Sequence, residues 1–131
     1  MRKIKFRAKT INSNEWVYGY YAQGGNDNEL KGVIMPQGQS VRELYEVKPE
    51  TVCQLLCVKN GIEFYTGDIL KGKQTFEKSS IYPLVYIEWN DVTLSYELVK
   101  INGSVNPPLN WLSEYEKVGN LIDNPELLGS R

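Results

Sequence analysis

Asp68 is the residue in this chain whose surroundings most resemble those of a catalytic acid. It stands in the phrase G-D-I, and Glu63 and Glu88 are the carboxylates that could join it. Two carboxylates in one pocket can act as general acid and base when their pKa values differ, and with water they can hold Mg²⁺. The alternative is structural, because an Asp in a turn accepts backbone N–H groups while Gly67 supplies an unusual φ angle. We favour the structural interpretation.

A row of basic residues near the N-terminus is the second candidate. Lys3, Lys5, Arg7 and Lys9 alternate with Ile4, Phe6 and Ala8, and aromatic residues follow at Trp16, Tyr18 and Tyr20. Single-strand binders combine a positive groove with aromatic stacking surfaces in this way. The same row would also suit the solvated face of a strand, where lysines discourage pairing with other chains, and this is the interpretation we favour. The candidate residues for binding an anion or nucleic acid are Arg2, Lys3, Lys5 and Arg7.

Cys53 and Cys57 form the third candidate group. In a strand they would point to one face about 13 Å apart, which is too far for a disulfide. The chain has no His, so a zinc site would need carboxylates or a second chain to complete four ligands. We interpret both cysteines as small buried hydrophobic residues. The sequence therefore predicts no metal, no cofactor and no catalytic residue.

Short strands and tight turns must position these residues. Alternation predicts strands over 2–9 and 15–21, joined as a hairpin. A polar, glycine-rich loop is expected over 24–32. The pair Asn60-Gly61 between apolar runs is a strong hairpin signal. The remaining predicted strands cover 33–35, 41–47, 52–58, 62–65, 69–70, 81–89, 92–101 and 118–122. We also predict a tight turn at Asn90-Asp91 and a solvated excursion over 71–80. Helical turns are expected after Pro108 and at the end of the chain, where Asn124 would be the N-cap, followed by Pro125 and Glu126.

Composition places the chain among ordinary globular proteins. Of 131 residues, 41% are apolar and 24% charged, and the net charge is −1, so no overall field attracts nucleic acid or an anionic membrane. The charge is uneven, because residues 1–9 hold five basic residues and no acid. No apolar stretch approaches the roughly 20 residues that span a bilayer, and no signal peptide is recognisable. We expect a cytoplasmic protein without membrane contact.

Many short strands and little helix predict a mainly β fold, all-β to α+β, with small, closed or strongly curved sheets and a short C-terminal helical turn. Three phrases then resemble the YopX family of phage and prophage proteins: R-x-I-K-F-R-A near the start, N-G-x-x-I-Y-x-G-D-I in the centre and I-G-N-I-x-x-N-P-E-L-L at the end. Phe64, Val118 and Leu121 stand where the family phrases have Ile. The signature residues are Phe6, Asn60, Gly61, Gly67, Asp68, Gly119, Asn120 and Pro125. Lys9 departs from the family, which usually has Trp there.

The resemblance implies a phage or prophage accessory protein with an SH3-like barrel, self-association into an oligomer and no established reaction. We expect one domain over 1–131, with an N-terminal hairpin and loop region over 1–50 and the barrel portion over 51–131. Our leading hypothesis is a non-enzymatic protein that acts through contacts with copies of itself and with a host or phage protein. The alternative is a nucleic-acid-binding accessory factor that uses the basic N-terminal strand.

Overall fold

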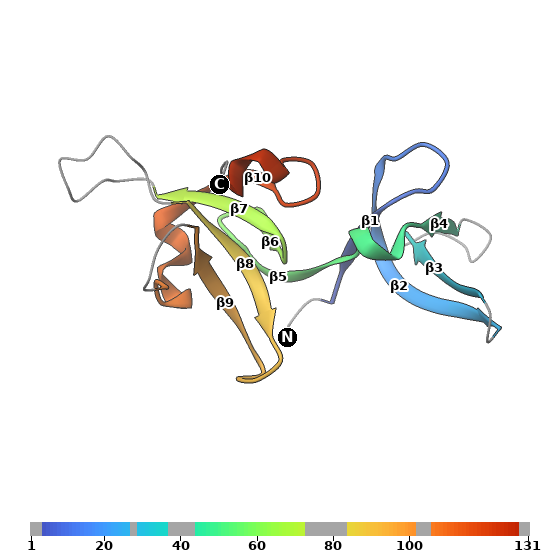
Figure 1. Cartoon of the computed structure of the whole chain (residues 1–131), viewed down its shortest axis with the longest axis horizontal. Coiled ribbons are helices and arrows are strands. Elements are labelled where there is room, and N and C mark those ends of the chain that lie inside the picture. The colour runs from blue at the N-terminus through green and yellow to red at the C-terminus, as the bar shows by residue number, and fades with distance from the viewer. Residues whose placement is uncertain (1–3, 27–28, 37–43, 73–83, 102–105, 129–131) are drawn as a thin grey trace. The chain divides into compact units, whose positions relative to one another are not determined.

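The computed structural model describes residues 4–26, 29–36, 44–72, 84–101 and 106–128. The predicted mainly β fold is confirmed: the described strands form two antiparallel sheets, and the helical elements are short 3₁₀ segments (Figure 1). The chain divides into two compact units, Met1–Cys57 and Val58–Arg131. Strand β5 (Cys53–Lys59) runs through the boundary between them.

In the first unit, four strands and the start of β5 form one sheet. They are β1 (Phe6–Lys9), β2 (Trp16–Asn26), β3 (Glu29–Met35) and β4 (Tyr45–Val47), in the order β4-β3-β2-β1-β5, and η1 (Pro49–Thr51) follows β4. The predicted β1–β2 hairpin is confirmed, with Phe6 opposite Gly19 and Lys9 opposite Trp16. Its turn is closed around the hydroxyl of Thr10, which accepts hydrogen bonds from the backbone N–H groups of Ser13 and Glu15.

The core of this unit lies on one face of the sheet. Ala8, Ile34 and Val47 are fully buried there, with Phe6, Val17, Tyr21 and Val52 packed against them. Gly19 is needed beside this core because a Cβ atom at that position would lie 2.1 Å from the carbonyl oxygen of Met35. Phe6 pairs across the ladder with this glycine and contacts the ring of Tyr21, with centroids 5.9 Å apart.

Two predictions for the first unit need correction. The loop predicted over 24–32 is wrong, because β2 and β3 pair continuously from Tyr20↔Met35 to Asn26↔Glu29. Backbone hydrogen bonds build that ladder, so a glycine-rich sequence can follow it without large side chains. The strand predicted over 41–47 is described only at Tyr45–Val47, and residues 37–43 lie outside the described part of the chain.

In the second unit, β6 (Ile62–Tyr65) follows β5 through the Asn60-Gly61 turn, and four strands form a sheet. They are β7 (Asp68–Gly72), β8 (Leu84–Asn90), β9 (Ser95–Lys100) and β10 (Tyr115–Asn120), in the order β10-β7-β8-β9. The helices are η2 (Leu109–Glu114) and η3 (Pro125–Leu128). The buried apolar residues of this sheet and of η2 are Ile69, Leu70, Val85, Ile87, Leu98, Leu112 and Tyr115.

The hairpin signal at Asn60-Gly61 is confirmed, since both residues have positive φ angles (53° and 79°). The helical turn after Pro108 is confirmed as η2. The closed, SH3-like barrel is not formed by the described strands, which make two open sheets. Lys71 and Gly72, placed in the solvated excursion, belong to β7, and residues 73–80 of that excursion are not described.

The remaining strand limits also shift. The strand predicted over 118–122 is β10, which starts at Tyr115 and ends at Asn120, with a bulge at Val118. The strand predicted over 81–89 is described from Leu84 and extends to Asn90 as β8. The turn at Asn90-Asp91 is wrong, because Asn90 pairs with Ser95 and residues 91–94 form a four-residue loop.

We expect Tyr115 to make the fold sensitive to alkaline pH. Burial raises the pKa of its phenol above the ordinary value of 10.0. In the unfolded chain the phenol ionises near pH 10, while the folded protein retains the proton, so stability falls as the pH rises from about 10 through the folded pKa. Tyr115→Phe should make that loss smaller, as measured by urea unfolding between about pH 9 and pH 11. Tyr45→Phe, at an exposed position, is the control, and equal slopes in wild type and Tyr115→Phe would contradict the prediction.

Candidate functional site

The basic row and the first β2 aromatics lie together on one face of the β1–β2 hairpin. Arg7 pairs across the ladder with Tyr18, and Lys9 pairs with Trp16. The Nζ atom of Lys5 lies 5.5 Å from the centroid of the Tyr18 ring, and that of Lys9 lies 5.3 Å from the Trp16 ring. The guanidinium carbon of Arg7 lies 4.7 Å from the Trp16 ring. These are cation–π distances, so the cations and rings stabilise one another.

Exposure separates the members of this row. Arg7 is only 5% exposed, so the fully solvated row that we favoured is wrong at this position, and Arg7 serves as a packed residue beneath Trp16. Lys5 and Lys9 are half-buried. Arg2 and Lys3, which were also candidates, lie outside the described residues. The structure therefore brings together Lys5 and Arg7 of the four candidates and adds Lys9 to them.

We call this surface the cation–aromatic face; it consists of Lys5, Arg7, Lys9, Trp16, Tyr18 and Tyr20. Tyr18 and Tyr20 are 43% and 48% exposed, and the period of two along a strand puts them on the same side. Aromatic rings next to cations can bind two kinds of ligand: planar anionic groups that stack on the rings, or apolar side chains that have acidic residues around them.

Asp68 is buried and paired. Its carboxylate has no exposed surface. Oδ2 accepts a hydrogen bond of 2.7 Å from the backbone N–H of Tyr65 and lies 3.2 Å from Nζ of Lys117 on β10. The same Nζ donates to the carbonyl oxygen of Glu63 and lies 5.7 Å from the centroid of the Phe64 ring. Asp68 therefore joins the β6–β7 turn to β10. Lys117 was not predicted as its partner from the sequence.

Glu63 and Glu88, the two carboxylates that could have joined Asp68 in a catalytic pair, have different surroundings from it. The Glu63 carboxylate accepts a hydrogen bond of 2.9 Å from the hydroxyl of Tyr65, and Glu88 is exposed on β8. Within the described part of the chain, no three His, Cys, Asp or Glu side chains gather as metal ligands would. No disulfide joins the two cysteines, and Cys53 is buried as expected, whereas Cys57 is only half-buried, so the interpretation as buried residues holds for Cys53 alone.

The loop at the end of the β8–β9 hairpin is a surface that the sequence did not reveal. We call it the β8–β9 tip; it comprises residues 91–94. Pairing between β7 and β8 ends at Tyr86, whereas β8 and β9 pair on to Asn90↔Ser95. The outer part of the hairpin is therefore a two-stranded ribbon among the described strands, and it ends in the tip (Figure 1). Val92 is 91% exposed and Leu94 is 71% exposed there.

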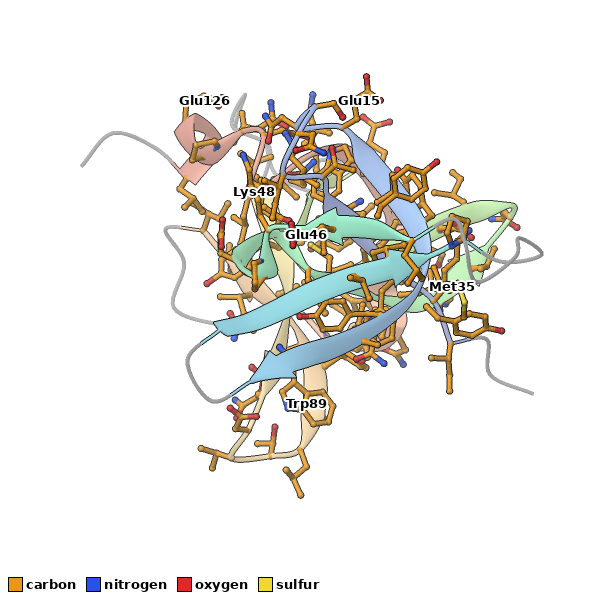
Figure 2. All side chains as sticks on the ribbon, turned by 90° about the vertical axis from the view of Figure 1, so that its right-hand side faces the viewer. Glu15, Met35, Glu46, Lys48, Trp89 and Glu126 are labelled. Atoms are coloured by element: carbon orange, nitrogen blue, oxygen red, sulfur yellow. The ribbon has the colours of Figure 1, made fainter. Side chains whose placement is uncertain are left out.

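A polar network holds the tip in one conformation. The side-chain oxygen of Asn90 accepts hydrogen bonds from the backbone N–H groups of Val92 (2.8 Å) and Thr93 (3.1 Å). Trp89 donates from Nε1 to the Asp91 carboxylate at 2.8 Å, and its ring meets that of Tyr96 edge to face, with centroids 5.0 Å apart. Figure 2 shows Trp89 close to the loop of this hairpin. The apolar side chains of the tip are thus presented by a structured turn.

Leu94 carries backbone strain. Its φ angle is 56°, in the left-handed region, which costs an L-residue with a Cβ atom about 1–2 kcal/mol. Glycine and asparagine are the usual residues in that conformation. A leucine that is mostly exposed recovers little of this cost by burial within its own chain.

The signature residues of the third phrase stabilise the turn after β10. The side-chain oxygen of Asn120 accepts hydrogen bonds from the backbone N–H groups of Ile122 and Asp123, at 3.0 and 2.8 Å. Asn124 precedes η3 as expected, and its side-chain oxygen accepts from the backbone N–H of Asn120 at 3.2 Å. A Cβ atom on Gly119 would meet that same oxygen at 2.6 Å. Pro125 begins η3.

The family model described as YopX protein matches residues 5–129 of this chain. The chain therefore belongs to the YopX family, which confirms the resemblance found in the three phrases. Among curated proteins, no match to the chain was found. None of the described helices is long and apolar enough to cross a membrane.

We expect Asp68 and Lys117 to be coupled in stability. Lys117→Met should be the costlier change, approaching the roughly 3–5 kcal/mol of a broken buried pair, because it leaves a buried carboxylate without its cation. Asp68→Asn should cost about 1–2 kcal/mol of stability. The amide oxygen of the new asparagine can still accept the hydrogen bond from the backbone of Tyr65. Lys117, whose side chain is 31% exposed, can turn toward water.

The double variant Asp68→Asn/Lys117→Met tests whether the pair acts as a unit. The free energy lost should be clearly smaller than the two single losses added together, because Lys117→Met no longer leaves a buried carboxylate without its cation once residue 68 is asparagine. Urea unfolding of the four proteins provides the measurement. Strict additivity would show that Asp68 and Lys117 do not stabilise each other.

Proposed function

We propose that this YopX-family protein is a non-enzymatic accessory protein of a phage or prophage that acts through protein–protein contacts, including contacts between its own copies. The observation that carries the proposal is the β8–β9 tip. Val92 and Leu94 are 91% and 71% exposed on a turn that hydrogen bonds hold in place. A turn whose backbone is already held by hydrogen bonds loses little backbone entropy when a partner covers it.

The surroundings of Asp68 support a non-enzymatic role. A general acid or base must reach a substrate, whereas the Asp68 carboxylate has no exposed surface and lies 3.2 Å from Lys117 Nζ. Its hydrogen bond to Tyr65 belongs to the turn between β6 and β7. The signature phrase around Asp68 accordingly explains the fold of the second unit rather than a reaction.

Self-association predicts an oligomer that resists salt. We expect light scattering coupled to size-exclusion chromatography to give a mass of at least two copies, at low salt and in about 1 M NaCl, because apolar contacts are not screened by ions. Dilution should shift the protein toward smaller species by mass action. A strict monomer at every concentration and at both salt levels would overturn self-association.

The cation–aromatic face favours a second candidate function, the binding of single-stranded nucleic acid. Lys5 and Lys9 could contact phosphates while Tyr18 and Tyr20, 43% and 48% exposed, offer rings for base stacking. The wild type should then be retained on a single-stranded DNA column at about 50 mM salt and released at about 200 mM. Lys5→Gln/Lys9→Gln should lose retention while Lys59→Gln, on exposed β5 surface, keeps it. Absence of retention by the wild type would remove this candidate.

A further inference from the structure

We propose that the β8–β9 tip of one copy docks on the cation–aromatic face of a second copy. This inference rests on the proposed self-association and names the surfaces that would form it. Its starting point is the combination of strain and exposure at Leu94, whose φ angle is 56° and whose exposed fraction is 71%. Sparsely populated backbone conformations persist where surrounding structure or function holds them. A second molecule that covers Leu94 and Val92 would supply the burial that their own chain does not.

Charge decides what kind of surface can cover the tip. The hairpin over residues 84–99 contains Glu88, Asp91 and Glu97 and no Lys or Arg. Asp91 is exposed in the tip itself, and Glu88 is exposed further along β8, opposite Glu97. Two such tips would bring like charges together, which disfavours a symmetric contact between them. The tip therefore needs a partner surface that is apolar at its centre and positive around it.

The cation–aromatic face has that complementary character. Its strand segments, 5–9 and 16–23, contain three basic residues and no acid, and Glu15 adjoins them at one end. Tyr18 and Tyr20 provide exposed ring surface. Lys5 and Lys9 lie beside these rings, with Nζ 5.5 Å from the Tyr18 centroid and 5.3 Å from the Trp16 centroid. Val92 and Leu94 can pack on the rings while Asp91 of the tip and the acids of β8 and β9 face the lysines.

The charges of the two units agree with this pairing. The first unit, residues 1–57, holds eight basic and six acidic residues, and the second, residues 58–131, holds seven basic and ten acidic residues. Because the tip and the face are different surfaces, two copies can either exchange the contact reciprocally as a twofold dimer or make it in one direction only, as a heterologous contact. Repetition of a heterologous contact gives a ring if the rotation closes and an open chain if it does not.

The test begins with a tip variant that should fold at least as well as the wild type. Leu94→Asn removes the apolar side chain and places a residue suited to positive φ at that position, and Val92→Thr removes apolar surface while keeping the β-branched shape. The double variant should keep or raise the Tm and weaken self-association at least about tenfold, as loss of an anchor does. Val58→Thr, at a 46% exposed site on β5, is the matched control and should associate like the wild type.

A mixing experiment identifies the second surface. The face variant Lys5→Glu/Lys9→Glu should also fail to associate alone, because its face would repel the acidic tip. When the tip variant and the face variant are mixed, one intact tip meets one intact face, so light scattering should show a 1:1 pair that grows no further. Circular dichroism of each variant alone shows that both remain folded. An interface between two copies of the same surface would give no such rescue.

The outcomes separate this inference from the proposed function. If the wild type is an oligomer and the folded tip variant is an equal oligomer, the tip is not the contact, and self-association stands through another surface. If the folded variants dissociate but the mixture remains monomeric, the face is not the acceptor, and the proposal is overturned. If the wild type itself is monomeric, both the inference and the self-association fail. Dissociation of both variants with rescue on mixing establishes the contact.

Discussion

The second unit is organised around a carboxylate with no access to water. Asp68 is 0% exposed, and a buried charge is tolerated only when it is paired and hydrogen-bonded. The backbone of Tyr65 supplies the hydrogen bond and Lys117 supplies the opposite charge. Because Lys117 is on β10, this requirement joins strands that are far apart in the sequence, and it sets β10 against β7 with Asn120 opposite Asp68.

The turn beside Asp68 extends the same joint. Gly67, with a φ angle of 87°, donates its N–H to the carbonyl of Ile87 at 2.7 Å and accepts from the N–H of Leu121 at 2.8 Å. The bulge at Val118 lets Lys117 pair with Leu70 while Gly119 pairs with Ile69. The central and closing phrases of the family therefore meet in one place. Their motifs describe how the unit is held together, which is why they identify kin better than chemistry.

The sequence predicted local structure wherever one residue type could adopt a conformation that others avoid. Asn60-Gly61 marked its turn and Pro108 preceded η2 because both signals act within a few residues. The β2–β3 ladder was missed because a glycine-rich stretch looks like a loop until a partner strand supplies its hydrogen bonds. Lys117 was missed as the partner of Asp68 because the contact joins residues whose pairing depends on strand order. Arg7 was expected in solvent because alternation fixes a face but not what covers it.

The β8–β9 hairpin shows where local rules and the fold disagree. Asn90-Asp91 is a good two-residue turn by sequence, yet Asn90 stays in the ladder and the loop runs to Leu94, a residue poorly suited to its positive φ. Real proteins depart from local consistency mainly at functional sites. Asn90 and Thr93 stabilise the turn through polar contacts, so a polar residue or glycine at Leu94 would satisfy the fold as well or better. The proposed contact with a second copy would give this apolar, exposed leucine a role that the folded chain alone does not.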